Sequence, residues 1–163
     1  MTEVQGVPSS SSDEASVNAP RLDETEEVWR IVEIESVEME LPGSHPEVVL
    51  AELVAPWRRL RIPVGFNEGN SIAYALRGVQ VARPMTHDLM AELLERHKVE
   101  VAALRLTAKH NGVYFAELET MGASGRAVVP CRPSDGIALI LRQKMEPPVV
   151  VANWLFEDPD VPE

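Results

Sequence analysis

The sequence of 163 residues contains a single cysteine, Cys131. One cysteine cannot form an intramolecular disulfide or a cysteine-based zinc site, so disulfide-stapled secreted scaffolds and cysteine-ligated zinc domains are excluded. With 45% hydrophobic residues, the chain has enough apolar side chains to bury a core without such staples. We therefore expect one domain in a reducing compartment.

Long apolar runs are also missing. Residues 1–18 have neither the basic segment nor the apolar segment of a secretory signal. No later stretch approaches the roughly 18 consecutive apolar residues of a membrane helix. We therefore expect a cytoplasmic protein that makes no contact with a membrane.

Basic charge is scarce, because the formal net charge is −11. Residues 1–27 carry −6 of this charge and residues 158–163 carry −3, which leaves −2 for the stretch between them. A nearly neutral domain does not attract nucleic acid over a distance, so any nucleic-acid contact should be weak and local to phosphate groups. We expect a disordered, acidic, Ser-rich tail over 1–26, a domain over 27–157 and an acidic tail over 158–163.

Apolar periodicity predicts strands separated by three helices. Alternating or β-rich runs predict strands over residues 28–39, 47–54, 58–64, 99–108, 113–120 and 126–131, followed by a short apolar run over 149–151. Asn111-Gly112 predicts a tight hairpin, because both residues tolerate positive φ. Helices and strands are clustered instead of alternating strictly. This favours a single-domain α+β fold, with a mostly antiparallel or mixed β-sheet packed with about three helices.

The predicted helices are identified by their caps and by helical spacing. The caps are Asn67 or Asn70 for a helix ending at Leu76, Thr86 for the second helix, and Ser134 for a helix reaching Arg142. In the second helix, apolar residues recur at helical spacing opposite charged ones, namely Leu89, Met90, Leu93 and Leu94. No glycine-rich phosphate loop, His-x-x-x-His pair, Gly-x-Ser-x-Gly elbow or sustained heptad occurs.

Two helix starts resemble one another. Residues 83–88 and 132–135 each place Arg-Pro before a hydroxyl residue and then an Asp in the first turn. Free amides at a helix start, together with a guanidinium, can hold phosphate, so the phosphate-binding candidates are Arg83, Arg132, Thr86 and Ser134. Asp88 and Asp135 can instead bind a divalent metal or activate water. The structural alternative is that each Asp stabilises its own helix and pairs with an Arg.

Two further side chains belong to the candidate site. His87 lies at a helix start beside Asp88, and an imidazole can transfer protons near neutral pH. Glu68 lies near another predicted helix start and can add a third carboxylate if the fold brings the three starts together. A partly buried guanidinium needs a counter-charge, so we expect Arg83 or Arg132 within roughly 4 Å of an Asp of either motif.

Three segments resemble the bifunctional nuclease family of bacteria and plants. They are Leu60-Arg61-Ile62-Pro63-Val64-Gly65 with Glu68, residues 83–89 (Arg-Pro-Met-Thr-His-Asp-Leu) and residues 132–139 (Arg-Pro-Ser-Asp-Gly-Ile-Ala-Leu). The resemblance covers about residues 29–155 and implies an α+β fold and hydrolysis of both DNA and RNA. The chain departs from the family pattern at Gly69, Gly136 and Cys131, and glycine loosens a helix start.

Two functions follow from these residues. In the first, a metal-assisted phosphodiesterase, the catalytic candidates are His87, Asp88, Asp135 and Glu68. Asp88 and Asp135 hold the metal, and magnesium or manganese suits such oxygen ligands. In the second, the motifs are structural and the protein is a regulatory or interaction module whose acidic N-terminal tail contacts a protein partner. A homo-oligomer is compatible with either function. An open cleft lined by His87 favours phosphate chemistry, whereas a closed, packed contact favours a structural role.

Overall fold

The computed structural model describes residues 28–39 and 45–157. The predicted tails over 1–26 and 158–163 lie outside the described residues. The first half of the sheet is an antiparallel meander of β1 (Trp29–Glu38), β2 (Glu47–Glu52) and β3 (Arg59–Pro63). Ile34 pairs with Leu50, which in turn pairs with Leu60, so all three side chains share one face. All three are buried, as the alternation in the sequence predicts.

A second meander forms the other half of the sheet. It consists of β4 (Glu100–His110), β5 (Val113–Gly122) and β6 (Gly125–Cys131), and each strand is antiparallel to the next. Asn111 and Gly112 both have positive φ, at 50° and 76°, between the paired residues His110 and Val113. The tight hairpin predicted from the Asn-Gly pair is therefore confirmed.

One short strand joins the two halves. β7 (Val149–Ala152) is antiparallel to β1 and parallel to β4, which gives a seven-stranded mixed sheet of order β3-β2-β1-β7-β4-β5-β6. A 3-10 turn, η1 (Asn153–Phe156), follows it and buries Leu155. With three helices on this sheet, the α+β prediction is confirmed.

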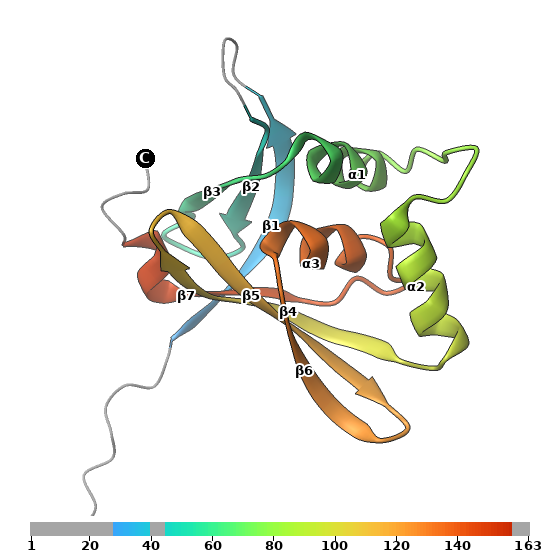
Figure 1. Ribbon diagram of the computed structural model, residues 1–163. Coiled ribbons are helices and arrows are strands. Elements are labelled where there is room, and N and C mark those ends of the chain that lie inside the picture. Colours follow the sequence, from blue (N-terminus) through green and yellow to red (C-terminus); the bar gives the residue numbers. More distant parts are fainter. Residues whose placement is uncertain (1–27, 40–44, 158–163) are drawn as a thin grey trace, which may run out of the picture.

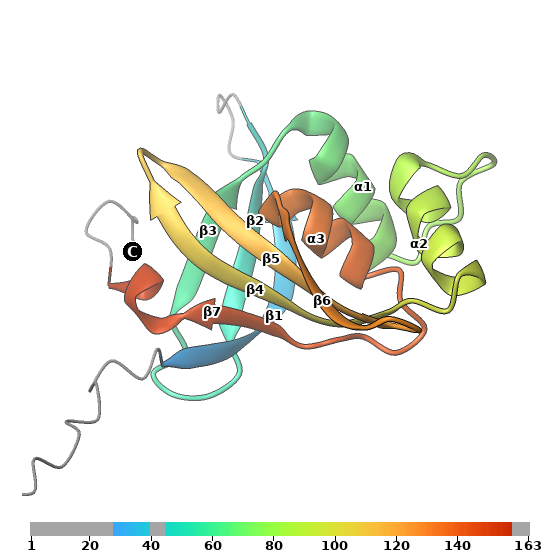
Figure 2. The same ribbon diagram turned by 60° about the horizontal axis from the view of Figure 1, so that its bottom comes forward.

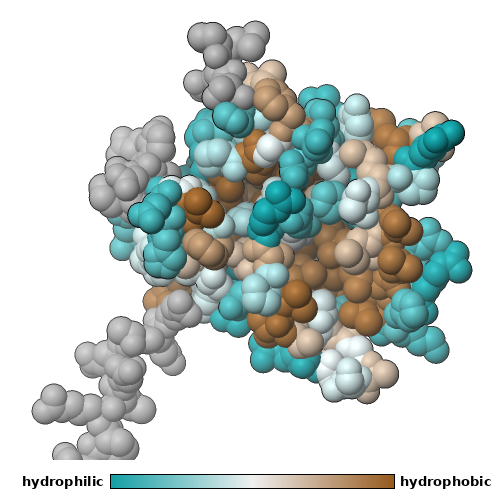
Figure 3. All heavy atoms as spheres, viewed as in Figure 1, coloured by the Kyte–Doolittle hydropathy of each residue, from teal (hydrophilic) through white to brown (hydrophobic). Residues whose placement is uncertain are grey.

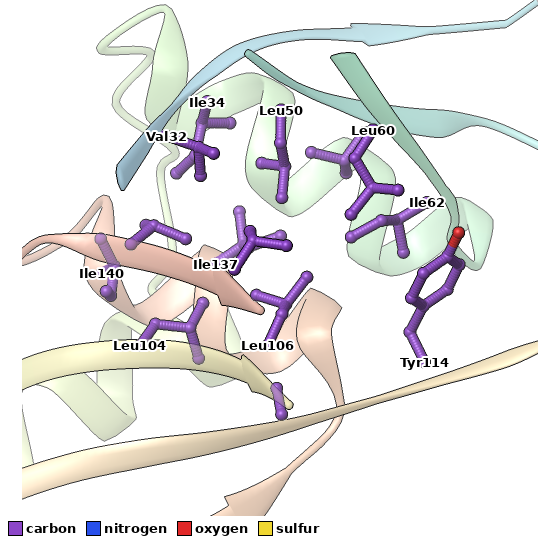
Figure 4. Packing of buried hydrophobic residues seen from close by; sticks show 14 of the residues in the cluster. Val32, Ile34, Leu50, Leu60, Ile62, Leu104, Leu106, Tyr114, Ile137 and Ile140 are labelled. Carbon is purple, nitrogen blue, oxygen red and sulfur yellow. The ribbon is translucent and has the colours of Figure 1, made fainter. Parts of the chain in front are cut away.

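The three helices are α1 (Phe66–Leu76), α2 (Thr86–Arg96) and α3 (Pro133–Ile140). In both ribbon views α3 lies against the curved sheet, and it contacts both α1 and α2 (Figures 1 and 2). Its residues Ile137 and Ile140 are fully buried and face Leu104 and Leu106 of β4 (Figure 4). No helix in residues 28–39 and 45–157 is long and apolar enough to cross a membrane.

Gly136 allows the close contact between α3 and β4. A Cβ atom built on Gly136 would lie 2.4 Å from Leu104 Cδ1 and 3.3 Å from Cys131 Sγ. At the start of α1, a Cβ atom on Gly69 would lie 2.8 Å from Pro46 Cγ. The two glycines that depart from the family pattern therefore sit where neighbouring side chains leave no room for a methyl group.

Helix α2 packs less tightly than its sequence predicts. None of its eleven residues is buried, and only Ala91 and Leu94 pack against the core. Leu89, Met90 and Leu93 are exposed, and apolar side chains gather over α2 on the face shown in Figure 3. The helix is amphipathic, but much of its apolar side does not meet the sheet, because α2 lies beyond the end of α3.

The helices begin earlier than predicted, so the cap predictions are wrong. The N-cap residues are Gly65, Met85 and Arg132, and none forms a side-chain capping hydrogen bond. Arg132 precedes Pro133, and proline holds the preceding residue in an extended conformation, which makes Arg132 the cap and Pro133 the first helical residue. At α2 the amide of the N-cap residue Met85 donates to the Asp88 carboxylate over 2.7 Å, and Thr86 is the first residue of the helix.

Candidate active site

The two Arg-Pro motifs meet at the adjoining starts of α2 and α3. The ring of His87 lies on the first turn of α2, and its Nε2 is 3.3 Å from Oδ1 of Asp135 on the first turn of α3. The expected meeting of the motifs is therefore confirmed. The side chain of His87 is only 17% exposed, so the contact forms at a largely covered junction of the two helices.

Arg132 connects this junction to α1. Its Nε donates to Asp135 Oδ2 over 2.7 Å, and its Nη2 donates to Asp135 Oδ1 over 2.8 Å and to Glu68 Oε1 over 3.0 Å. The expected ion pair within 4 Å is thus present, and it includes Glu68. The Arg132 side chain is 66% exposed, and its Nη1 makes no hydrogen bond to any described residue. Two N–H groups of this guanidinium therefore face solvent.

The other phosphate-binding candidates lie in different surroundings. Arg83 is exposed in the loop before α2 and forms no ion pair within residues 28–39 and 45–157. Thr86 is exposed on the first turn of α2, whereas Ser134 is buried on the first turn of α3. Of the four candidates, only Arg132 has a contact that ties it to both Glu68 and Asp135.

Asp88 is held by an arginine that the motifs did not indicate. Its Oδ1 accepts from Arg142 Nε over 2.5 Å, while its Oδ2 accepts from the Met85 amide. Arg142 follows the C-terminal end of α3, and its side chain is only 10% exposed. It also donates to Ala138 O, Ser71 O and Ser71 Oγ, and so links all three helices. The sequence analysis missed it, and the one signal that could have indicated it is a charged residue directly after the apolar run 137–141.

Ser71 completes a chain of side chains through the site. Its Oγ lies 3.0 Å from Nδ1 of His87, so Ser71, His87 and Asp135 are connected in that order. A serine nucleophile must reach its substrate, and Ser71 is only 1% exposed. The three residues therefore lack an accessible nucleophile, and Ser71 serves the histidine ring.

Both aspartates are stabilised in the ionised form. Burial raises the pKa of Asp135, but hydrogen bonds from Arg132 and His87 lower it by more, so the pKa lies below its usual value. Burial also raises the pKa of Asp88, but hydrogen bonds from the Met85 amide and from Arg142 lower it by more, so this pKa too lies below its usual value. Each carboxylate thus has its own arginine.

These contacts do not assemble the expected metal ligands. Within the described part of the chain, no three His, Cys, Asp or Glu side chains are grouped so that they could hold a metal ion. The oxygens of Asp88 and Asp135 already accept hydrogen bonds from Arg142 and Arg132, which a bound cation would have to displace. The residues present therefore do not fit a preformed metal centre, and a magnesium or manganese requirement stays a prediction.

Two cavities flank the ion pair between Asp88 and Arg142. One of about 730 Å³ lies between α2, the start of β4 and the segment after α3, and one of about 440 Å³ lies between the end of α1 and the start of α2. Asp88 and Arg142 line both cavities, whereas His87, Asp135 and Arg132 line neither. The cluster around His87 therefore lies outside these two cavities, with the ring of His87 largely covered and the side chain of Arg132 exposed.

Comparison with known proteins gives a family match over most of the chain. The bifunctional nuclease domain matches residues 48–163. An uncharacterized protein of Mycobacterium tuberculosis is 31% identical over 111 residues, which cover 68% of this chain and 65% of that protein. Bifunctional nuclease 1 of Arabidopsis thaliana is 30% identical over 116 residues, covering 68% of this chain and 34% of the plant protein.

A second plant protein matches to a similar extent. Bifunctional nuclease 2 of Arabidopsis thaliana is 28% identical over 120 residues, covering 71% of this chain and 36% of the plant protein. The chain thus spans less than two thirds of the mycobacterial protein and about one third of each plant protein. Residues Glu68, His87, Asp88, Arg132 and Asp135 all lie within the family match.

Proposed function

Because the chain belongs to the bifunctional nuclease domain family, we propose that it hydrolyses phosphodiester bonds of DNA and RNA at the cluster of Glu68, His87, Arg132 and Asp135. The observation that carries this proposal is the exposed guanidinium of Arg132, which shares the Asp135 carboxylate with His87 and whose Nη1 makes no hydrogen bond to a described residue. A guanidinium matches the geometry of a phosphate group and stays charged at all relevant pH values.

In this proposal Arg132 holds the phosphate and offsets the charge that develops on it during cleavage. Asp135 and Glu68 orient Arg132 through three hydrogen bonds, and His87 holds Asp135 from the start of α2. Long-range attraction contributes little, because residues 28–157 carry a formal charge of only −2. Substrate contact is therefore local and sensitive to salt.

Cleavage of single-stranded DNA and of RNA by the full chain tests the proposal. Arg132→Gln should lower the cleavage rate by about 100-fold, which is the usual effect of removing one donor to a transition state. Arg126→Gln is the matched control, because Arg126 also makes two hydrogen bonds to one carboxylate, that of Glu119, but lies on β6 away from the cluster. Equal activity of Arg132→Gln and Arg126→Gln would contradict the assignment.

A non-catalytic interaction module is the second candidate. It is favoured by one observation, that Asp88, Asp135 and Glu68 each hydrogen-bond to an arginine within the fold, as a purely structural network requires. In that case wild type should leave both nucleic acids uncut with magnesium or manganese present. Removal of residues 1–26 should abolish binding of a protein partner while leaving the melting temperature unchanged.

A further inference from the structure

The hydroxyl of Ser71 lies between a guanidinium and an imidazole. Arg142 Nη2 is 3.1 Å from Ser71 Oγ on one side, and His87 Nδ1 is 3.0 Å from it on the other. The three residues come from the segment after α3, from α1 and from α2, which adjoin in both ribbon views (Figures 1 and 2). This site is largely shielded from water, because Ser71 is 1% exposed and Arg142 10%.

The protons in this contact can be assigned from the chemistry of the groups. A guanidinium has five N–H donors and no acceptor, so Ser71 Oγ must accept from Arg142. A hydroxyl has a single proton, and the acceptor that remains near Ser71 Oγ is Nδ1 of His87. Because the hydroxyl also has a second lone pair, Ser71 either donates to Nδ1 of His87 or accepts from it, according to the tautomer of the ring.

The contact on the opposite side of the ring decides between the two tautomers. Both oxygens of Asp135 accept hydrogen bonds from Arg132, so this side chain is a carboxylate and can only accept. Nε2 of His87, at 3.3 Å from Asp135 Oδ1, must then be the donor. The Asp135 contact thus places the single proton of the neutral ring on Nε2, and Ser71 donates its proton to the lone pair of Nδ1.

We propose that Arg142 and Ser71 are positioning residues that hold His87 as an Nε2–H donor to Asp135, so that its ring fixes the carboxylate that orients Arg132 and does not shuttle a proton. This inference rests on the proposed phosphodiesterase function. It differs from the proton-transfer role that the sequence suggests for His87. To accept a proton from substrate at Nε2, the ring would need its other proton on Nδ1, where the Ser71 proton already points.

The first test reads the tautomer directly and does not depend on activity. Long-range ¹⁵N–¹H correlation spectra of the full-length wild-type protein are recorded as the pH is raised until the His87 signals stop changing. Comparison with His87→Gln identifies the signals of this ring among those of the four histidines. Nε2 should give a protonated-type shift and Nδ1 an unprotonated-type shift. The reverse pattern overturns the inference, whether or not the protein cleaves nucleic acid.

The second test separates donation from proton transfer. Gln in place of His87 keeps an N–H donor at a similar reach but cannot transfer a proton, whereas Leu removes both abilities. Loss of the donor to Asp135 releases the carboxylate that orients Arg132, and loss of one donor to a transition state lowers a rate by about 100-fold to 1,000-fold. His87→Leu should show a loss of that size, and His87→Gln should lose about tenfold or less. Equal losses in the two variants would show that His87 transfers a proton.

A double-mutant cycle tests whether Ser71 acts through His87. Ser71→Ala removes the hydroxyl but leaves Arg142 paired with Asp88, and Ser71→Thr keeps the hydroxyl as a rescue variant. In the wild-type background we expect Ser71→Ala to lower cleavage about tenfold and Ser71→Thr to restore most of it. In the His87→Gln background Ser71→Ala should have little further effect. The same tenfold cost in both backgrounds would make Ser71 a structural residue only.

The outcomes also separate this inference from the proposed function. A protein that shows no cleavage, but whose ring proton is on Nε2, refutes the phosphodiesterase proposal and leaves the tautomer assignment standing. A protein that cleaves nucleic acid, but whose ring proton is on Nδ1, refutes the inference and leaves the phosphodiesterase proposal standing.

Discussion

Nε2 of His87 lies 3.3 Å from Oδ1 of Asp135, and this contact joins the first turn of α2 to the first turn of α3. The same carboxylate accepts two hydrogen bonds from Arg132. The Asp135 carboxylate should therefore contribute to the stability of the fold.

Asp135→Asn should lower the free energy of unfolding by about 1 kcal/mol, because an amide cannot offer Arg132 two acceptor oxygens. Thermal melting with and without magnesium or manganese measures this loss. Glu119→Gln is the control, because Glu119 pairs with Arg126 through two hydrogen bonds outside the site. A metal-dependent rise in melting temperature of the wild type, absent in Asp135→Asn but kept in Glu119→Gln, would support the predicted metal site. No rise in any variant would contradict it.

Asp88→Asn should destabilise the protein more than Asp135→Asn does, by about 3 kcal/mol, since it leaves the covered guanidinium of Arg142 without a counter-charge. Chemical denaturation of Asp88→Asn, Arg142→Met and the double variant measures the coupling between the two residues. The double variant should be less destabilised than the sum of the single variants. Strict additivity would show that the ion pair does not hold α2.

Stability should fall in acid through Glu52, which lies at the opposite end of the sheet from α2. Hydrogen bonds from Arg58 are the main cause that lowers the pKa of Glu52 to about 2; burial opposes them, and Arg30 adds to the lowering. The folded pKa is below that of the unfolded chain, so the stabilisation is complete above about pH 4.5 and is lost as the pH falls towards 2. The loss should be about 3 kcal/mol.

Denaturation of the wild type and of Glu52→Gln between pH 6 and pH 2 checks this expectation. The glutamine variant should be less stable at pH 6 and should show a flatter dependence on pH. Glu33→Gln, on the exposed side of β1, is the control and should keep the wild-type slope. A slope in Glu52→Gln equal to that of wild type would assign the acid sensitivity to other carboxylates.

Gly136→Ala should destabilise the protein by about 1–3 kcal/mol, although alanine is the better helix former. The added methyl group would meet Leu104 Cδ1 at 2.4 Å in a fully buried contact. Gly122→Ala is a milder substitution, because its Cβ would meet Val99 Cγ2 at 3.4 Å. Shortening the opposing side chain in Gly136→Ala with Leu104→Val should recover part of the loss. Wild-type stability of Gly136→Ala would mean that α3 can move away from β4.

Much of the fold could be predicted because its cause is local. The alternation in β1 and the Asn111-Gly112 turn each depend on a few neighbouring residues, and both predictions hold. The place of β7 could not be predicted. Four apolar residues do not indicate which strands they pair with. β7 pairs with β1, which lies far from it in the sequence, and it also pairs in parallel with β4.

In the candidate site, too, some features could be predicted from the sequence and others could not. The two Arg-Pro motifs meet as predicted, but through the contact of His87 with Asp135 and not through an ion pair between motifs, because Arg132 pairs with Asp135 of its own motif and Asp88 pairs with Arg142. Ser71 and Arg142 were missed because their importance depends on the packing of α1 against α3, which sequence spacing does not specify. The exposed apolar side of α2 was missed for a related reason, since helical periodicity shows that a helix has an apolar side but not what covers it.

The position of β7 also affects the order of events during synthesis on the ribosome. The two meanders are local and can form as soon as each emerges, but the four-residue strand that pairs with both is made last. Until then β1 and β4 each present an unpaired edge, with backbone donors and acceptors open to other chains. Nascent chains of this protein should therefore depend on chaperones until residues 149–152 emerge from the exit tunnel.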